Sequence, residues 1–233
     1  MGDFLSTDPG VAAASNALIL DQLQGEGQPV VTPGPIEFSH WIEFRSLIAS
    51  RPIPVVSSNV SVREEGTLRP AGARSALVTV EGVRLGLLGV LGADPYQKIQ
   101  APEGLEFVLQ DPAAAIGELI EELRRRAEIV VVMGCMTDEE AVALAAQVSG
   151  VDVLISGFDS TASDRPWRMG QTILNRTGQR GQYLSVTHLI VSPEGGIVDW
   201  GGRNVNLDAK VPADARVDSL VARALGSAAG GCR

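Results

Sequence analysis

Residues 130–160 read VVVMGCMTDEEAVALAAQVSGVDVLISGFDS, and this stretch decides the fold. Residues 130–133 are an uninterrupted apolar run, which is typical of a strand buried on both faces. Thr137 and Glu140 have the spacing of a capping box, so a helix is predicted to begin there. A serine-glycine pair ends this helix, and residues 151–155 form a second buried strand. Two buried strands joined by one helix predict a right-handed parallel crossover.

The loops that follow these two strands are the first candidates for a functional site. A parallel sheet binds its ligands at the carboxyl ends of its strands. Here those loops contain Gly134 and Cys135 after the first strand, and residues 157–160, GFDS, after the second. The chemistry of these side chains therefore decides the functional interpretation.

Outward from this unit, strands and helices alternate, and two hairpins are added. Residues 76–80 and 83–90 flank a Glu-Gly pair, and residues 183–191 and 197–200 flank a second turn. Residues 61–74 are polar and contain glycine, which predicts a surface loop. This order of elements predicts an α/β sandwich in which mixed sheets are covered by helices.

The composition excludes several classes of function. A chain of 233 residues, 45% hydrophobic and 20% charged, is expected to be globular with a real core. The formal net charge of -9 argues against binding a nucleic-acid backbone, but it is compatible with a small anionic ligand. No apolar run reaches the roughly 18–20 residues of a membrane span, and no signal peptide is recognised. Cys135 and Cys232 form no disulfide framework and indicate no compartment.

Six short stretches stand in an order that resembles one known family. They are Gly2-Asp3 and residues 34–38, 56–60, 89–91, 134–135 and 157–160. In this order the chain resembles the catalytic domain of bacterial 5'-nucleotidases, within the calcineurin-like metallophosphoesterases, over residues 1 to about 225. The resemblance implies an α/β fold of four layers, an αββα sandwich with mixed sheets.

The resemblance also implies an active site with two divalent metal ions, such as manganese or zinc. Two such ions, about 3.5–4 Å apart, clamp a phosphate ester while a metal-bound hydroxide attacks it. The family's motifs are Asp-x-His, Gly-Asp, Gly-Asn-His-Glu, a lone His after a buried strand, and Gly-His-x-His. The Asp-x-His segment has no counterpart in this sequence.

Few of the family's ligand positions are kept in the first half of the chain. Asp3 matches the Gly-Asp motif and is the only retained ligand position. In the Gly-Asn-His-Glu motif Gly34 and Glu37 remain. The Asn position is Pro35, and the His position, which protonates the leaving group, is Ile36. Neither replacement has a side-chain donor for a metal.

The later motifs are altered in the same way. Cys135 stands at the position of the lone His, and Phe158 and Ser160 replace both His residues of Gly-His-x-His. Cys135 has no second cysteine nearby, so we interpret it as a buried inert thiol rather than a redox or metal-binding one. Asp159 is interpreted as a solvated loop residue, with a substitute oxygen ligand as the alternative. The predicted remnant of the pocket consists of Asp3, Glu37, Cys135 and Asp159.

The resemblance divides the chain into two parts. Residues 1–203 are predicted to form the metallophosphoesterase-like domain, and residues 204–233 a linker and a carboxyl-terminal helix. Compared with the family, the chain is expected to be truncated at both ends. That expectation predicts an apolar exposed edge or a gap in the central sheet beside residues 2–5, and therefore self-association. By resemblance the protein is expected to be periplasmic or extracellular.

Three functions are compatible with these residues. The first is a phosphoesterase-like domain without catalysis or cofactor, which acts as a scaffold or binds a small anionic ligand or a protein partner. The second is a metal-dependent phosphohydrolase with an altered site, which acts on nucleotides or other phosphate monoesters. The third is an unrelated doubly wound binding protein, but the Gly-x-Gly-x-x-Gly loop that would favour it is absent from the sequence.

Overall fold

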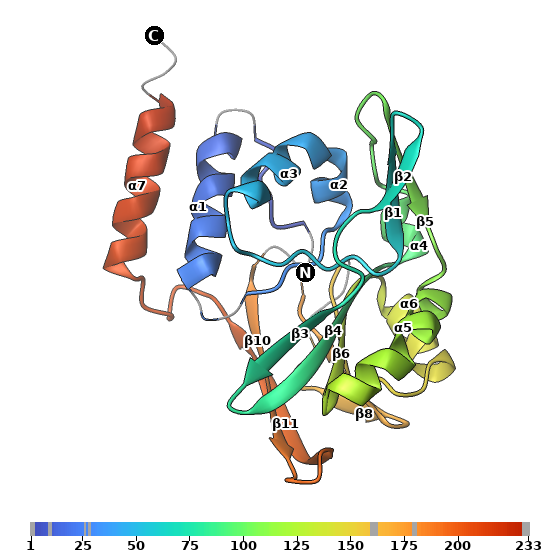
Figure 1. The fold of residues 1–233 in the computed structure, drawn as a ribbon. Helices are drawn as coiled ribbons and strands as arrows, with labels where there is room; N and C mark the ends of the chain where they lie inside the picture. The colour runs from blue at the N-terminus through green and yellow to red at the C-terminus, as the bar shows by residue number, and fades with distance from the viewer. Residues whose placement is uncertain are drawn as a thin grey trace.

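The computed structural model describes residues 3–8, 11–25, 27, 29–158, 163–178 and 181–229. Figure 1 shows an α/β arrangement with mixed sheets. The helices are α1 Ala12–Gly25, α2 Pro35–Ser39, α3 Trp41–Ala49, α4 Ala93–Tyr96, α5 Pro112–Arg126, α6 Asp138–Gln147 and α7 Ala215–Ala229. The strands are β1 Val60–Glu64, β2 Thr67–Pro70, β3 Ala76–Val80, β4 Val83–Leu91, β5 Leu105–Leu109, β6 Ile129–Cys135, β7 Val153–Ser156, β8 Trp167–Met169, β9 Thr172–Arg176, β10 Tyr183–Val191 and β11 Ile197–Asn206.

The predicted crossover is the centre of the fold. Strands β6 and β7 are parallel neighbours joined by α6, within a six-stranded sheet of order β3-β4-β6-β7-β9-β8. The capping box is confirmed, because Glu140 N donates to Thr137 Oγ1 at 3.2 Å and Thr137 N donates to Glu140 Oε2 at 2.9 Å. Strand β6 is parallel to β4 on one side and to β7 on the other, so the carboxyl ends of these three strands lie at one edge of the sheet.

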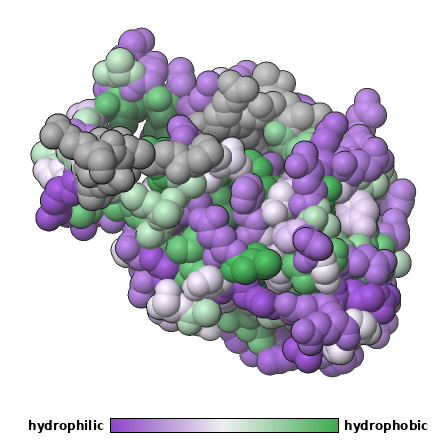
Figure 2. Space-filling view, turned by 90° about the horizontal axis from the view of Figure 1, so that it is seen from above, coloured by the Kyte–Doolittle hydropathy of each residue, from purple (hydrophilic) through white to green (hydrophobic). Residues whose placement is uncertain are grey.

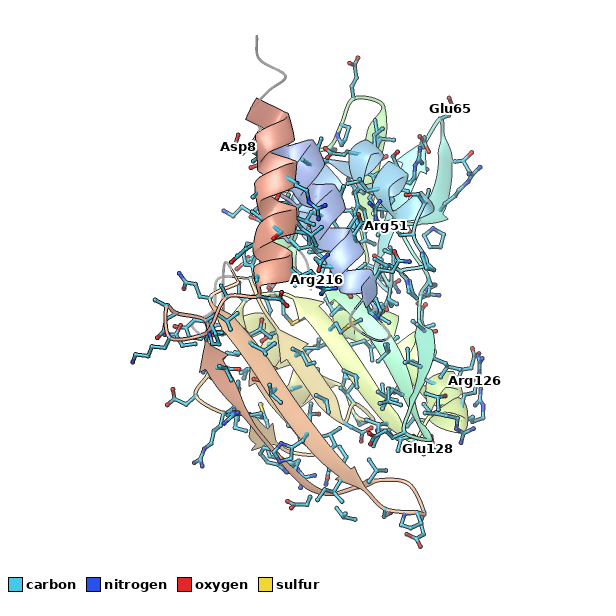
Figure 3. The ribbon with its side chains drawn as sticks, turned by 90° about the vertical axis from the view of Figure 1, so that its left-hand side faces the viewer. Asp8, Arg51, Glu65, Arg126, Glu128 and Arg216 are labelled. Atoms are coloured by element: carbon cyan, nitrogen blue, oxygen red, sulfur yellow. The ribbon has the colours of Figure 1, made fainter. Side chains whose placement is uncertain are left out.

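Helices α5 and α6 cover one face of the six-stranded sheet, and the β10–β11 pair lies on the other. Along β9, Leu174 packs in a cluster with Ile116 of α5 and Leu144 of α6. The next residue, Asn175, donates from Nδ2 to Thr187 Oγ1 of β10 at 2.7 Å. Helix α7 lies beside α1, and these two helices with α3 stand apart from α5 and α6 (Figures 1 and 3). This is the layered, mixed-sheet sandwich that the sequence predicts.

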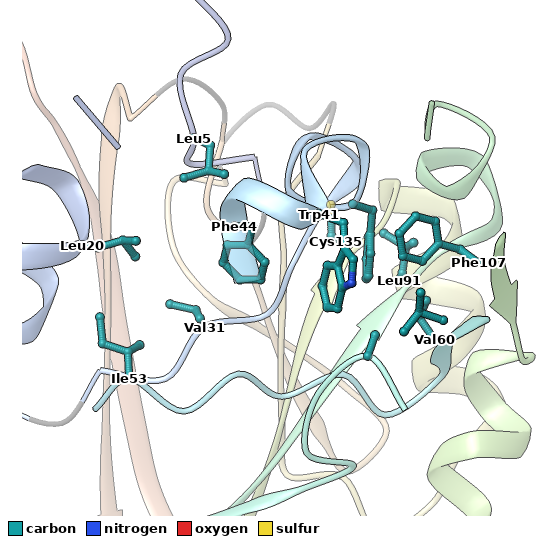
Figure 4. Close-up of a cluster of buried hydrophobic side chains, with 13 residues drawn as sticks. Leu5, Leu20, Val31, Trp41, Phe44, Ile53, Val60, Leu91, Phe107 and Cys135 are labelled. Atoms are coloured by element: carbon teal, nitrogen blue, oxygen red, sulfur yellow. The ribbon is translucent and has the colours of Figure 1, made fainter. Parts of the chain in front are cut away.

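A second apolar core joins the amino-terminal helices to the end of the six-stranded sheet (Figure 4). It contains Phe38, Trp41 and Phe44 from α2 and α3, together with Leu91 at the end of β4 and Cys135 at the end of β6. Burial of these large side chains is what fixes α2 above the carboxyl ends of the central strands. The candidate site lies at this junction.

The prediction of a surface loop at residues 61–74 is wrong. That segment holds β1 and β2, which form a three-stranded antiparallel sheet with β5 in the order β2-β1-β5. Val60 and Val62 alternate inward, and the turn between the strands uses Glu65 and Gly66 with φ of 50° and 78°. These two residues supply the left-handed backbone that a tight hairpin turn requires.

Beside residues 3–5, the described part of this segment, the central sheet does not show the expected exposed edge. Strand β6 is paired with β4 on one side and with β7 on the other, and Leu5 is buried. The sheet ends instead at β3 and β8. Strand β11 continues to Asn206, past the predicted domain boundary at residue 203. Self-association stays a prediction.

One face of the molecule, seen in Figure 2, mixes hydrophilic and hydrophobic side chains. Within the described ranges, no helix combines the length and the apolar character that a membrane span requires.

Candidate functional site

Three of the four predicted pocket residues come together where α2 meets the end of β6. Glu37 lies in α2, Cys135 ends β6, and Asp3 of the amino-terminal segment donates its N–H to Glu37. The charges of Asp3 and Glu37 both act on the Cys135 thiol. Asp159, the fourth residue, lies outside the described residues, as does Ser160.

The carboxylate of Glu37 is fully buried and its two oxygens each accept two backbone N–H groups. Oε2 accepts from Asp3 N at 2.6 Å and from Gly34 N at 2.8 Å. Oε1 accepts from Phe4 N at 2.9 Å and from Leu5 N at 3.0 Å. Because a buried carboxylate is costly unless such donors surround it, Glu37 acts here as an anchor that ties residues 3–5 to α2.

Burial raises the pKa of the Glu37 carboxyl above its usual value, and the charge of Asp3 acts in the same direction. The N–H groups of Gly34, Asp3 and Leu5 oppose this shift, because they favour the ionised form. The hydrogen bonds already occupy both oxygens, so this carboxylate has little remaining capacity to bind a cation or a substrate proton.

Asp3, which the resemblance predicts to be the one retained ligand position, has a left-handed backbone with φ of 61°. Aspartate tolerates this region better than most residues do. Its Oδ1 accepts the N–H of Ile36 at 2.8 Å, in the first turn of α2. Burial raises the pKa of the Asp3 carboxyl, and the Ile36 N–H opposes the shift. The contact between the two segments is therefore reciprocal: Asp3 donates its N–H to Glu37, and its side chain accepts the N–H of Ile36.

Cys135 is a free cysteine with 1% of its surface exposed. Burial raises the pKa of its thiol well above the usual range, and the charges of Asp3 and Glu37 add to this effect. Its burial agrees with the sequence interpretation. A thiol that stays protonated is neither a good nucleophile nor a good metal ligand.

Apolar side chains occupy three further positions at which the resemblance predicts ligands or the acid. Pro35 is buried at the start of α2, and Ile36 and Phe158 pack against the core cluster of α2 and α3. Two adjacent divalent ions need several carboxylate, imidazole or thiolate ligands. Over the described ranges, no group of three or more His, Cys, Asp or Glu side chains is gathered as a metal site. The donor set described here does not fit a two-metal centre.

Sequence reasoning missed Asn59, which fixes the floor of this region. Its side chain is buried, donates from Nδ2 to Leu91 O at 2.8 Å and to Gln110 O at 3.0 Å, and accepts from Leu91 N at 2.9 Å. These bonds hold the end of β4 beside β1. Asn59 directly follows Ser57 and Ser58, so no apolar pattern in the sequence points to this role.

The sequence matches no protein-family model and has no significant match among curated proteins. Solved structures do match. The sulfate thiohydrolase SoxB of Thermus thermophilus gives a TM-score of 0.80 at 21% identity, over 97% of this chain and 42% of that one. A 5'-nucleotidase precursor, also from Thermus thermophilus, gives 0.83 at 16% identity, over 98% of this chain and 49% of that one. This chain has the fold of a 5'-nucleotidase-type metallophosphoesterase domain.

A third structure of this fold is the calcineurin-like phosphoesterase YfkN from Bacillus subtilis, with a TM-score of 0.72 at 15% identity over 98% of this chain and 83% of that one. The chain described here spans less than half the length of SoxB and of the nucleotidase precursor. At these identities the likeness concerns the fold.

Proposed function

We propose that this chain is a phosphoesterase-fold domain without metal-dependent catalysis, which serves as a scaffold or binding module. The observation that carries the proposal is the bonding of Glu37, whose carboxylate accepts four backbone N–H groups instead of facing a ligand. A group used in this way holds the chain together. It is not placed for proton transfer or for metal coordination.

The neighbours of Glu37 support the same proposal. Proline and isoleucine side chains offer no lone pair to a cation, and Pro35 and Ile36 flank Glu37 directly. The Cys135 thiol is buried and held protonated. Apart from Glu37, Asp3 is the only carboxylate among the described residues of this site, and a single further carboxylate does not make a site for two divalent ions.

The alternative is a metal-dependent phosphohydrolase with an altered site. Asp3 favours it, because its carboxylate stands at the junction of α2 and β6 and is the one ligand position that the resemblance predicts to be kept. On this alternative, turnover of a phosphate monoester would depend on the Asp3 charge.

Hydrolysis measurements separate the two proposals. The purified chain is assayed with adenosine monophosphate and with p-nitrophenyl phosphate, in the presence of Mn²⁺ or Zn²⁺ and after chelation. The proposed scaffold function predicts the same background rate in every condition and in Asp3→Asn. Metal-dependent turnover that disappears in Asp3→Asn would overturn the proposal and establish the hydrolase.

A further inference from the structure

One face of the two central strands is incompletely covered. Strand β6 is apolar and is paired on both sides, which predicts burial on both faces. Val130 and Val132, in the cluster with α5 and α6, are fully buried. Val131 and Met133 alternate to the opposite face and are only half-buried, as is Ile155 of β7. Because the middle of a parallel sheet is normally covered by other segments, part of a layer is absent over this face.

A row of residues that crosses the sheet shows where the cover stops. Its four members are direct partners in the parallel register and therefore face the same side: Gly89, Met133, Ile155 and Asn175. At one end, Thr32 lies so close to Gly89 that a Cβ atom there would be 2.5 Å from Thr32 Oγ1. At the other end, Asn175 Nδ2 donates to Thr187 Oγ1 of β10 at 2.7 Å. The two middle members are the half-buried ones.

The uncovered part of this row is wide enough for polypeptide strands. Neighbouring strands of a sheet lie about 4.8 Å apart, so Gly89 and Asn175 are separated by roughly 14 Å. The segment of Thr32 lies over one of them and β10 over the other, and the same spacing leaves room for two strands between these covers. Figure 3 shows the orange β10–β11 hairpin in front of one side of the sheet, beside the yellow-green central strands.

Each cover has a strand edge that is unpaired in the described part of the chain. Strand β10 pairs with β11 alone. On the far side of β11, Asn204 N donates to Asp164 O at 3.3 Å, close to the edge strand β8. The free edge of β10 is therefore the one that faces the centre of the sheet. The other cover is paired on one side, where Val31 forms a parallel bridge with Val55.

Strand β10 lacks the features that protect an exposed edge. Natural edge strands carry charged residues, above all lysine, or proline, which prevent the addition of another strand. The sequence of β10, YLSVTHLIV, contains no Lys, Arg, Asp, Glu or Pro. A sheet of two strands is also only marginally stable by itself. The composition of β10 thus suits a strand that has a partner on each side.

We propose that the face formed by Val131, Met133 and Ile155 receives a β-hairpin of a partner protein, one strand of which pairs with β10. The hairpin presents β-branched apolar side chains to this face and main-chain N–H and C=O groups to the edge of β10. In such strand addition the main-chain hydrogen bonds supply affinity and the alternate side chains supply specificity. The inference does not depend on the proposed function, because a chain with hydrolase activity would present the same face.

Hydrogen–deuterium exchange with a designed hairpin peptide tests this proposal. The probe is Lys-Thr-Val-Thr-Val-D-Pro-Gly-Val-Thr-Val-Thr-Lys, whose valines share one face. We expect saturable binding, and exchange in residues 183–191 slowed by about tenfold or more, because N–H groups of β10 gain acceptors. Exchange in β2, which belongs to the separate β2-β1-β5 sheet, should not change. The control peptide is N-methylated at the residues whose N–H groups point outward, and it should bind about tenfold more weakly.

Variants of the uncovered face give a second measurement. Met133→Lys should weaken binding of the probe by about tenfold or more, because a charge would be buried beneath it. The matched control Val142→Lys changes an exposed valine of α6, on the opposite side of the sheet, and should leave binding unchanged. Thermal melts verify folding, and the uncharged Met133→Gln replaces Met133→Lys if the latter is unfolded.

Several results would overturn the proposal. They are the absence of saturable binding to the native chain, equal affinity of the probe and the N-methylated peptide, and unchanged exchange in residues 183–191 on binding. Equal affinity of the Met133 and Val142 variants would also do so. The same holds if light scattering shows that the chain alone is a dimer in which these amides are already protected, because a second copy would then cover the face.

Discussion

Asp3 and Glu37 hold each other's backbone segments in place. Asp3 N donates to Glu37 Oε2 at 2.6 Å, and Asp3 Oδ1 accepts from Ile36 N, one residue before Glu37, at 2.8 Å. Both oxygens of Glu37 and Oδ1 of Asp3 therefore accept N–H groups of the protein's own backbone.

Glu37→Gln is expected to destabilise the protein although it preserves the side-chain shape. The amide nitrogen would face two of the four N–H donors that the carboxylate now accepts, and these would stay buried without an acceptor. We predict a loss of about 2–4 kcal/mol in the free energy of unfolding, measured by urea denaturation. The control Glu121→Gln, exposed on α5, should change it by less than about 0.5 kcal/mol. Equal stability of Glu37→Gln and the native chain would contradict the anchoring role.

At Asp3 the acceptor oxygen should matter more than the charge. Asparagine keeps an acceptor for Ile36 N and tolerates the left-handed backbone, so Asp3→Asn should cost less than about 0.5 kcal/mol. Asp3→Ala loses the bond and strains the backbone at φ of 61°, and should cost about 1–3 kcal/mol. Denaturation of both variants compares them directly. A cost for Asp3→Asn as large as that for Asp3→Ala would mean that the charge itself is required.

Much of the fold follows from the sequence because its signals are local. The apolar strand at residues 130–133 and the Thr137–Glu140 capping box each lie within a few residues, and both are confirmed. The hairpin at Glu65-Gly66 was missed although its turn has the same Glu-Gly signal as the predicted one at Glu81-Gly82. Strand β2 is exposed along its whole length, so it lacks the apolar alternation that identifies a strand.

The site was predictable only in part. The sequence places Asp3, Glu37 and Cys135 in one region, and the structure brings them together. The sequence gives no sign that Glu37 binds the backbone of residues 3–5, because those hydrogen bonds join segments more than thirty positions apart. Nor does it reveal that Met133 and Ile155 are only half-buried, because the cover of a strand face depends on which other segments the fold places over it.

Cys135 should behave as an inaccessible thiol. In Cys232→Ser it is the single cysteine, and we expect Ellman's reagent to label it much more slowly in the native state than in denaturant. Its pKa is raised on folding, so the unfolded thiol, with an ordinary pKa of 9.0, loses its proton first. The stabilising contribution is present below that value and is lost as the pH rises above it.

The matching pH measurement compares Cys232→Ser with the double variant that also carries Cys135→Ala. The free energy of unfolding should fall more steeply above about pH 9 in the single variant, because only that chain must keep a buried thiol protonated. Rapid native-state labelling, or identical pH profiles of the two variants, would contradict this description of Cys135.

Gly89, in one of the stretches that carry the family resemblance, should not accept a side chain. A Cβ atom there would lie 2.3 Å from Val56 O and 2.5 Å from Thr32 Oγ1. Because the nearer obstacle is backbone, we predict that Gly89→Ala costs about 2–3 kcal/mol. Gly117→Ala is the control, since its Cβ would meet no atom within 4 Å and should stabilise α5 by about 0.5–1 kcal/mol. Thermal and urea denaturation that rank the two variants equally would contradict the close packing at Gly89.

The most direct test of the proposed loss of the metal centre is a count of bound metal. The native chain is incubated with excess Mn²⁺, passed through a gel-filtration column, and analysed for metal content. Because Pro35 and Ile36 offer no ligand and Glu37 is occupied by backbone N–H groups, we predict well under one ion per chain. Two ions per chain that persist through the column, and are lost in Asp3→Asn, would contradict the proposal.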